Sequence, residues 1–130
     1  MSVYLKFILD FDLRIFKNMS QIINLTNKTF EKEVLKSKIP VLVDFWTSWC
    51  SSCKILESIL NELASELKNK LKIVKFDAGD PKNQKLVKKY QIQGIPNLQL
   101  FKNGKAVKEL IGLKSKETLK KELSFVLDNI

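Results

Sequence analysis

The sequence predicts an α/β fold in which helices flank both faces of a central mixed β-sheet. Short apolar segments with strand character alternate with segments of helical periodicity, which favours parallel pairing of the strands. Towards the C-terminus, an Asn-Gly pair joins two further strand-like segments and predicts an antiparallel hairpin. The chain has 130 residues, of which 45% are hydrophobic, so a single domain can bury a core of its own.

The first elements are expected between residues 22 and 46. Residues 22–25 are predicted to form a short strand, and Asn27 is expected to cap the helix that follows. Residues 41–46 are β-branched and aromatic apart from one charge, Asp44, which is typical of a strand buried on both faces. The inward face of the first helix is expected to consist of Phe30, Val34 and Leu35.

A longer amphipathic helix is expected directly after the buried strand. Its polar residues alternate with an apolar face made of Leu56, Ile59, Leu60, Leu63 and Leu67. The elements beyond it are predicted as strand, helix, strand, strand and helix, at residues 73–77, 83–90, 97–102, 106–111 and from residue 115 onward. Ser115 is expected to cap the last helix, whose buried face is marked by Leu119, Leu123, Val126 and Ile130.

Residues 1–18 form an extension ahead of the domain, which we expect to cover residues 19–130. Apolar and charged residues alternate in the extension, as in a strand with one apolar face. Two interpretations are open: translation starts at Met19, or the extension adds an edge strand or a dimerising arm. Asp10 and Asp12 interrupt the apolar core that a signal peptide requires. No apolar run approaches the roughly 18 residues that span a bilayer, so no membrane partner is expected.

The formal net charge is +9, and the positive residues are 22 lysines and one arginine. Nucleic-acid readers use arginine for bidentate contacts with bases, and the lysines here are dispersed along the chain. We therefore expect no nucleic-acid partner, but a general preference for acidic protein surfaces. The chain is expected to be a monomer.

The only two cysteines, Cys50 and Cys53, lie where the buried strand is followed by the amphipathic helix. Side chains at positions i and i+3 of a helix are neighbours, so the two sulfurs can form a disulfide without moving the backbone. So short a loop stabilises the fold by only about 2 kcal/mol, which makes the pair better suited to disulfide exchange than to stapling. Two cysteines without any histidine cannot supply the four ligands of a structural zinc site, so no metal is expected.

The two cysteines are expected to differ in reactivity. Cys50 begins the helix, where unpaired N–H groups and the helix dipole favour a thiolate, so we expect it to be the nucleophile. Cys53 lies one turn further in and is expected to be more buried, as suits the thiol that resolves a mixed disulfide. Two inert, buried cysteines remain the alternative interpretation of the spacing.

Three motifs together resemble the thioredoxin family. They are Asp-Phe-Trp-Thr-Ser-Trp-Cys-Ser-Ser-Cys-Lys at residues 44–54, Gly-Ile-Pro at residues 94–96 and Phe-Lys-Asn-Gly at residues 101–104. The similarity extends over residues 20–130. It implies the thioredoxin fold and a cytoplasmic protein-disulfide reductase that serves electron transport and cell redox homeostasis. It further implies disulfide-containing protein substrates, no bound cofactor, and reduction of the oxidised pair by a thioredoxin reductase that uses NADPH.

The resemblance also implies roles for further residues. Asp44 matches the acid/base that assists deprotonation of the resolving thiol, here Cys53, and Lys75 matches its buried partner. From the residues alone, Asp44 could instead reach solvent or pair with a lysine. The substrate-binding residues implied by the family are Trp49, Gly94, Ile95, Pro96 and Gly112, with the bond before Pro96 in the cis form.

The chain departs from the family pattern between and after the cysteines. Ser51 and Ser52 replace the usual Gly-Pro, and linker residues influence the reduction potential. Ser58 replaces a proline that kinks the helix, so a straighter helix is expected. Two alternative functions therefore stay open. One is an oxidant or isomerase of the same fold, and the other is a binding module whose thiols are dispensable.

Overall fold

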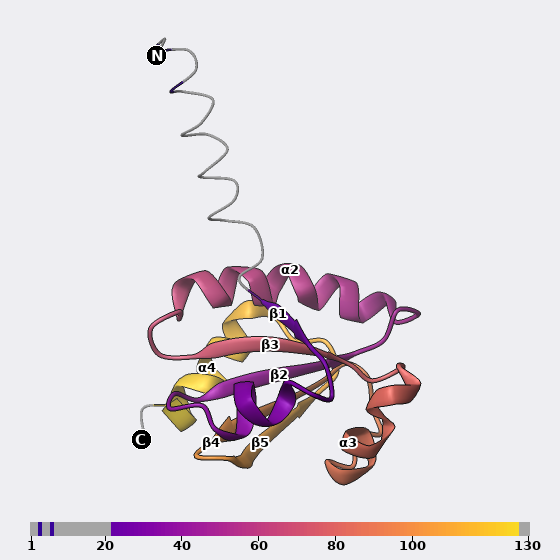
Figure 1. The fold of residues 1–130 in the computed structure, drawn as a ribbon. Helices are drawn as coiled ribbons and strands as arrows, with labels where there is room; N and C mark the ends of the chain where they lie inside the picture. The colour runs from indigo at the N-terminus through magenta and orange to yellow at the C-terminus, as the bar shows by residue number, and fades with distance from the viewer. Residues whose placement is uncertain (1–2, 4–5, 7–21, 128–130) are drawn as a thin grey trace.

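The computed structural model of the chain describes residues 22–127, together with Val3 and Lys6. Apart from Val3 and Lys6, the residues on which the alternatives for residues 1–18 depend lie outside the described residues, as does Ile130 with its predicted buried position. Within the described part, a five-stranded sheet has helical segments on both faces (Figure 1). The predicted α/β architecture is therefore confirmed.

The sheet is mixed, as predicted, with the strand order β1-β3-β2-β4-β5. β3 pairs in parallel with both β1 and β2, whereas β4 is antiparallel to β2 and β5 is antiparallel to β4. The strands are β1 at Ile23–Leu25, β2 at Val41–Trp46, β3 at Lys72–Asp77, β4 at Asn97–Lys102 and β5 at Lys105–Ile111. The three-residue β1 and the strand β5 form the two edges, and the pairing of β5 with β4 is shifted in register at Leu100/Phe101.

Two long helices cover one face of the sheet. They are α2 at Ser51–Glu66 and α4 at Lys116–Leu127. Leucines of both helices pack in one cluster with β-strand residues such as Leu42 and Leu98. Ser115 caps α4 as expected, because its hydroxyl accepts a hydrogen bond from the Thr118 N–H at 3.1 Å. α2 continues through Ser58, whose hydroxyl donates to the Ile55 carbonyl at 3.0 Å.

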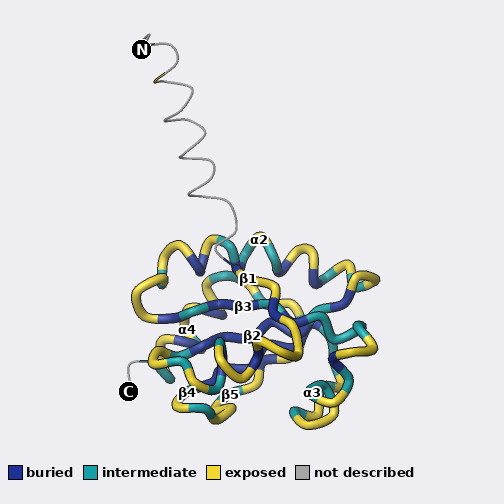
Figure 2. The backbone as a smooth tube through the Cα atoms, viewed as in Figure 1, coloured by how far each residue is buried: buried dark blue, intermediate teal, exposed yellow. Residues whose placement is uncertain are grey.

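Shorter helical segments cover the opposite face. They are a π-helical segment at Glu31–Leu35, a 3₁₀ turn at Pro81–Asn83 and α3 at Gln84–Lys89. Phe30, Phe76 and Phe101 form an aromatic core there, with ring centroids 5.4 and 5.8 Å from that of Phe30. Figure 2 shows the result: the central strands are buried, whereas the outer sides of the helices are exposed.

β2 lies in the middle of the sheet, and every residue from Val41 to Phe45 is buried. Side chains alternate between the two faces of a strand. Val43 and Phe45 belong to the core on the side of α3, so Asp44 between them points to the face that carries α2. An ionisable side chain is thus held in the interior beneath the cysteine-bearing helix.

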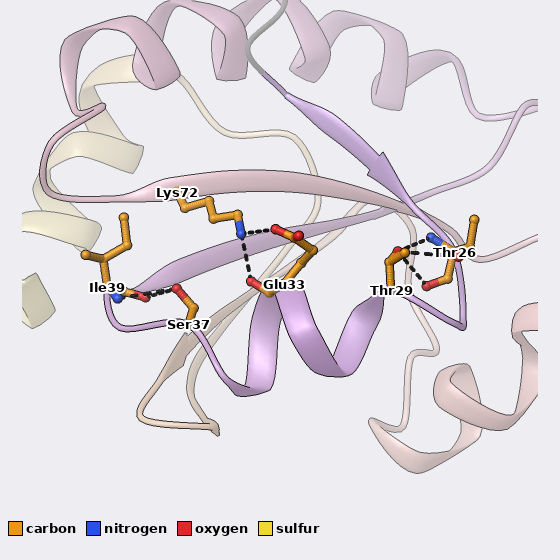
Figure 3. A network of polar contacts seen from close by, with 6 residues as sticks. All are labelled: Thr26, Thr29, Glu33, Ser37, Ile39 and Lys72. Carbon is orange, nitrogen blue, oxygen red and sulfur yellow. Dashed lines mark hydrogen bonds and ion pairs between the residues drawn. The ribbon is translucent and has the colours of Figure 1, made fainter.

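The expected cap of the first helix is wrong. The Asn27 amide donates to the Lys82 carbonyl at 3.1 Å and makes no cap. The turn before the helical segment is held by two threonines: the Thr29 hydroxyl accepts a hydrogen bond from the Thr26 N–H at 3.0 Å (Figure 3). Threonine hydroxyls compete in this way with helical hydrogen bonds.

The π-helical segment that follows the threonine turn is tied to β3. The Lys72 ammonium is paired with the Glu33 carboxylate and also donates to the Glu33 carbonyl at 3.0 Å (Figure 3). This double contact joins the small helical layer to the sheet.

In the described part of the chain, no helix is both long and apolar enough to cross a membrane.

Truncating α2 on its buried side should destabilise the protein strongly. Leu60 is 0% exposed and packs between α2 and the sheet, so Leu60→Ala should lower the free energy of unfolding by about 2 to 5 kcal/mol. Ile55 lies on the same helix but is 55% exposed, so Ile55→Ala should cost less than about 1 kcal/mol. Urea unfolding followed by circular dichroism measures both values, and equal losses would contradict this packing.

Candidate active site

Cys50 and Cys53 form a disulfide at the start of α2, with their Cα atoms 5.3 Å apart. β2 ends at Trp46, and the chain turns so that the Cys50 N–H donates to the Thr47 carbonyl at 3.4 Å. Cys50 has an extended backbone and is the N-cap of α2, where its sulfur accepts a hydrogen bond from the Cys53 N–H at 3.2 Å. The Cys50 sulfur thus occupies the place of the oxygen that usually caps a helix, and the helix N-terminus favours negative charge there.

The two sulfurs differ in access, as predicted. Cys50 is partly exposed, whereas Cys53 is only 4% exposed and belongs to the buried side of α2. A disulfide partner from solvent can therefore reach Cys50 first.

Of the two linker residues, Ser51 is exposed, and Ser52 places its hydroxyl 3.4 Å from the Cys50 sulfur. A hydroxyl donor beside this sulfur is the feature by which the linker can influence it.

Asp44 is 1% exposed, and its two carboxylate oxygens accept no hydrogen bond from the described residues. The alternative in which Asp44 reaches solvent or pairs directly with a lysine is therefore wrong. Burial raises the pKa of this carboxyl from its usual 3.8 to about 7, an effect that Lys75 opposes and Glu57 reinforces. An acid with such a pKa can both accept and release a proton near neutral pH.

Lys75 is the register partner of Asp44 on the adjacent strand β3, as its predicted partnership requires. Its ammonium, however, is not bonded to Asp44. It donates to Glu57 Oε1 at 3.1 Å and lies 4.5 Å from the centroid of the Trp46 ring. Glu57 was not among the predicted site residues, because it is one of the polar residues that alternate with the apolar face of α2. The available signal was its spacing of four residues from Cys53, which places both on one side of the helix.

A pocket of about 380 Å³ lies beside the buried cysteine. Its walls come from the end of β2, the first turns of α2 and β3: Trp46, Thr47, Ser48, Cys53, Lys54, Glu57 and Lys75. The Trp46 indole N–H and the Thr47 hydroxyl are buried there without a partner among the described residues. Polar groups therefore line the pocket that Cys53 borders.

The predicted substrate-binding residues lie in two parts of the chain: Trp49 directly precedes Cys50, and the others belong to the loop at residues 94–96 and to Gly112, which is hydrogen-bonded to that loop. Trp49 is 75% exposed, and its ring lies over Gly79, where an added Cβ would approach Trp49 Cη2 to 2.5 Å. Pro96 follows a cis peptide bond, as implied by the family, and its carbonyl accepts from the Gly112 N–H at 2.8 Å. Gly79 was missed, since its sequence context carries no signal of a contact 30 residues away.

The loop before Pro96 has an apolar neighbour that the sequence analysis also missed. Gly94 lies so close to Ile111 that a Cβ there would come within 2.9 Å of Ile111 Cγ2. Ile111 is 53% exposed at the end of β5, next to Gly112, whose φ is +90°. Ile95 packs partly against the aromatic core.

Within the described residues, no group of three or more His, Cys, Asp or Glu side chains is placed to hold a metal ion.

Comparison with known proteins places the chain in a family. The thioredoxin family model matches residues 21–124. The thioredoxin of Rickettsia bellii is 45% identical over 96 residues, which cover 74% of this chain and 90% of that protein. The thioredoxin of Mycobacterium tuberculosis is 40% identical over 111 residues, which cover 85% and 94% of the two chains.

A third relative is the bifunctional thioredoxin reductase/thioredoxin of Mycobacterium leprae, which is 40% identical over 114 residues. The match covers 88% of this chain and 24% of that longer protein. The matched region of this chain includes the cysteine pair at the helix start, the buried Asp44 and the cis Ile95–Pro96 bond. The chain therefore belongs to the thioredoxin family, and its Cys50–Cys53 pair makes it a thiol-disulfide oxidoreductase.

Proposed function

We propose that this protein reduces disulfide bonds of cytosolic proteins, with Cys50 as the nucleophile and Cys53 as the resolving thiol. The observation that carries the proposal is the difference between the sulfurs: Cys50 is accessible at the helix N-terminus, and Cys53 is buried one turn behind it. The nucleophile in thiol-disulfide exchange must be both ionised and reachable, whereas the resolving thiol needs only to reach its neighbour.

The reaction begins with attack of the Cys50 thiolate on one sulfur of the substrate disulfide. The substrate bond breaks, a mixed disulfide with Cys50 forms, and the released substrate sulfur takes up a proton. Cys53 then loses its proton and attacks Cys50, so that the Cys50–Cys53 disulfide forms and the second substrate sulfur leaves and is protonated. The substrate has gained two electrons from the dithiol and two protons, which balance the proton that Cys53 loses and the one that Cys50 lost when it ionised.

Asp44 is the base that we assign to the second step. Its carboxyl lies on the face of the sheet that carries α2, and its pKa of about 7 lets it take the Cys53 proton at neutral pH. Lys75 acts on Asp44 through its charge from the neighbouring strand, since its ammonium is bonded to Glu57.

The substrate is proposed to dock as an extended segment beside the cis Ile95–Pro96 bond. Ile95 offers its backbone, and Trp49, Gly94 and Gly112 supply apolar surface near the cysteines. The exposure of Trp49 and the seat that Gly79 provides for its ring support this role, because a large exposed aromatic side chain is typical of a docking surface.

Regeneration of the dithiol is assigned to a thioredoxin reductase that draws its electrons from NADPH. The relative from Mycobacterium leprae, whose name combines both activities, supports this pairing. We place the protein in the cytoplasm, where thiols are kept reduced, as a monomer that serves electron transport and cell redox homeostasis.

One observation favours a second candidate, an oxidant or isomerase. The Ser52 hydroxyl beside Cys50 can donate to its thiolate, which stabilises the reduced form and raises the reduction potential. The potential of the Cys50–Cys53 couple decides between the two functions.

Equilibration against glutathione should give a reduction potential close to about −270 mV, the range of a general reductant. A value between about −180 and −120 mV would instead establish the oxidant or isomerase. Ser52→Ala should make the potential more negative by about 30 mV, because it removes the hydrogen-bond donor. Ser51→Ala is the matched control, since Ser51 is exposed and should leave the potential unchanged.

Cys53→Ser should trap the mixed disulfide. The variant keeps the nucleophile but cannot resolve the adduct, so each chain should hold one molecule of a disulfide-bonded protein such as insulin. Non-reducing electrophoresis and mass spectrometry detect the adduct. The control is Cys50→Ser, which retains only the buried sulfur. Equal adduct formation by both variants would show that access does not assign the roles.

Asp44→Asn should slow the resolving step by about 10²-fold, the usual contribution of a general base. Stopped-flow measurement of mixed-disulfide breakdown tests this, and an unchanged rate would exclude Asp44 as the base.

The same variant should alter the dependence of stability on pH. In the oxidised wild type the raised pKa means that the folded state binds more protons than the unfolded state between about pH 4 and 7, so stability falls as pH rises through this window. From pH 5 to pH 8 the wild type should lose about 3 kcal/mol more than Asp44→Asn. Urea unfolding at the two pH values measures the difference, and parallel curves would contradict a buried, unpaired Asp44.

A further inference from the structure

Glu57 is a charged group at the site to which the proposed reaction gives no part. It lies on α2, four residues beyond Cys53, and lines the same pocket as that cysteine. Its carboxylate receives the Lys75 ammonium at 3.1 Å. The side chain of Lys75 is only 14% exposed and that of Glu57 is 42% exposed, so this ion pair lies at the boundary between interior and solvent.

The ion pair determines where the charge of Lys75 is located. Asp44 and Lys75 are register partners on neighbouring strands, which lie about 4.8 Å apart in a sheet. From this position a lysine could bond to the carboxyl beside it. Instead, the ammonium is held by a carboxylate on α2, and Asp44 is left with no hydrogen bond from the described residues.

We propose that Glu57 is a positioning residue that holds the Lys75 ammonium away from Asp44 and thereby sets the proton affinity of Asp44. Two effects act in the same direction. An ammonium bonded to Glu57 stabilises the Asp44 carboxylate less than a free one would, and the negative charge of Glu57 itself disfavours a second negative charge close by. The electrostatics agree, since Lys75 lowers the pKa of Asp44 and Glu57 raises it.

The surroundings of Asp44 leave few other charges to consider. On β3 the facing charged group is Lys75, and on the other neighbouring strand, β4, the register partner is the apolar Leu98. On α2 the titratable groups of the pocket are Cys53, Lys54 and Glu57. Lys54 is exposed, and Cys53 does not titrate while it is in the disulfide. The oxidised protein therefore isolates the effect of Glu57 on Asp44.

The direct test is the titration of the Asp44 carboxyl by carbon-13 NMR in the oxidised full-length chain. Glu57→Gln keeps a hydrogen-bond acceptor but removes the charge, so the midpoint for Asp44 should move to lower pH by about one unit, a tenfold loss of proton affinity. Glu57→Ala, which also releases Lys75, should move it further. Glu62→Gln is the matched control, because Glu62 lies on the same helix and is also paired with a lysine, Lys116, at 3.4 Å. An unchanged midpoint in both Glu57 variants would overturn the proposal.

A second background separates the two effects. In Lys75→Met, Glu57→Ala can act only through the loss of the Glu57 charge, because there is no ammonium to release, so its shift should be smaller than in the wild type. Equal shifts in the two backgrounds would show that Glu57 does not act by holding Lys75.

The kinetic consequence rests on the proposed function of Asp44 as the base for Cys53. The acidic limb of the pH profile of mixed-disulfide breakdown should move in Glu57→Gln by as much as the NMR midpoint does. If the midpoint moves and the profile does not, the assignment of Asp44 as the base fails, while the influence of Glu57 on its proton affinity stands. If the midpoint stays in place, the present proposal fails whatever the profile does.

Discussion

The structure depends on a strand that is buried on both faces and leads straight into a helix. β2 is the third strand of the sheet and pairs with β3 and β4, so its direction is fixed on both sides. α2 is fixed in turn by leucines that are fully buried against the sheet. The turn between them therefore has little freedom, and Cys50 is presented at the start of the helix with its sulfur already bonded to the Cys53 N–H. Reactivity here follows from rigid placement of an ordinary side chain.

The same rigidity explains how a carboxyl can remain in the interior. An unpaired buried charge would destabilise the fold, and Asp44 avoids this cost by holding its proton up to neutral pH. The protein thus gives up some stability under basic conditions and keeps, beneath the cysteine-bearing helix, a carboxyl that changes its charge near neutral pH. Charges at the rim of the core act on such a group to different degrees, since the Lys75 side chain is 14% exposed and is screened less by water than that of Glu57, which is 42% exposed.

Most of the fold could be predicted from local patterns, and the failures have physical causes. The alternation of apolar runs located every strand of the described sheet to within one residue, because burial on a pleated surface dictates side-chain type. Asn27 was misread since asparagine suits both a cap and a long-range contact, and the choice depended on Lys82, 55 residues away. The cysteine pair was predictable from spacing. The contact of Lys75 with Glu57 was not predictable from sequence, because tertiary packing decides which residue of β3 lies next to which residue of α2.

The two edges of the sheet bear on how the protein behaves in a crowded solution. β1 offers only three residues for pairing, and β5 carries Lys105 and Lys108 and is paired out of regular register with its neighbour. Short or lysine-bearing edges make poor templates for strand addition by another chain. A disulfide reductase built this way can approach another polypeptide chain through its cysteines without offering that chain a sheet edge on which to add a strand.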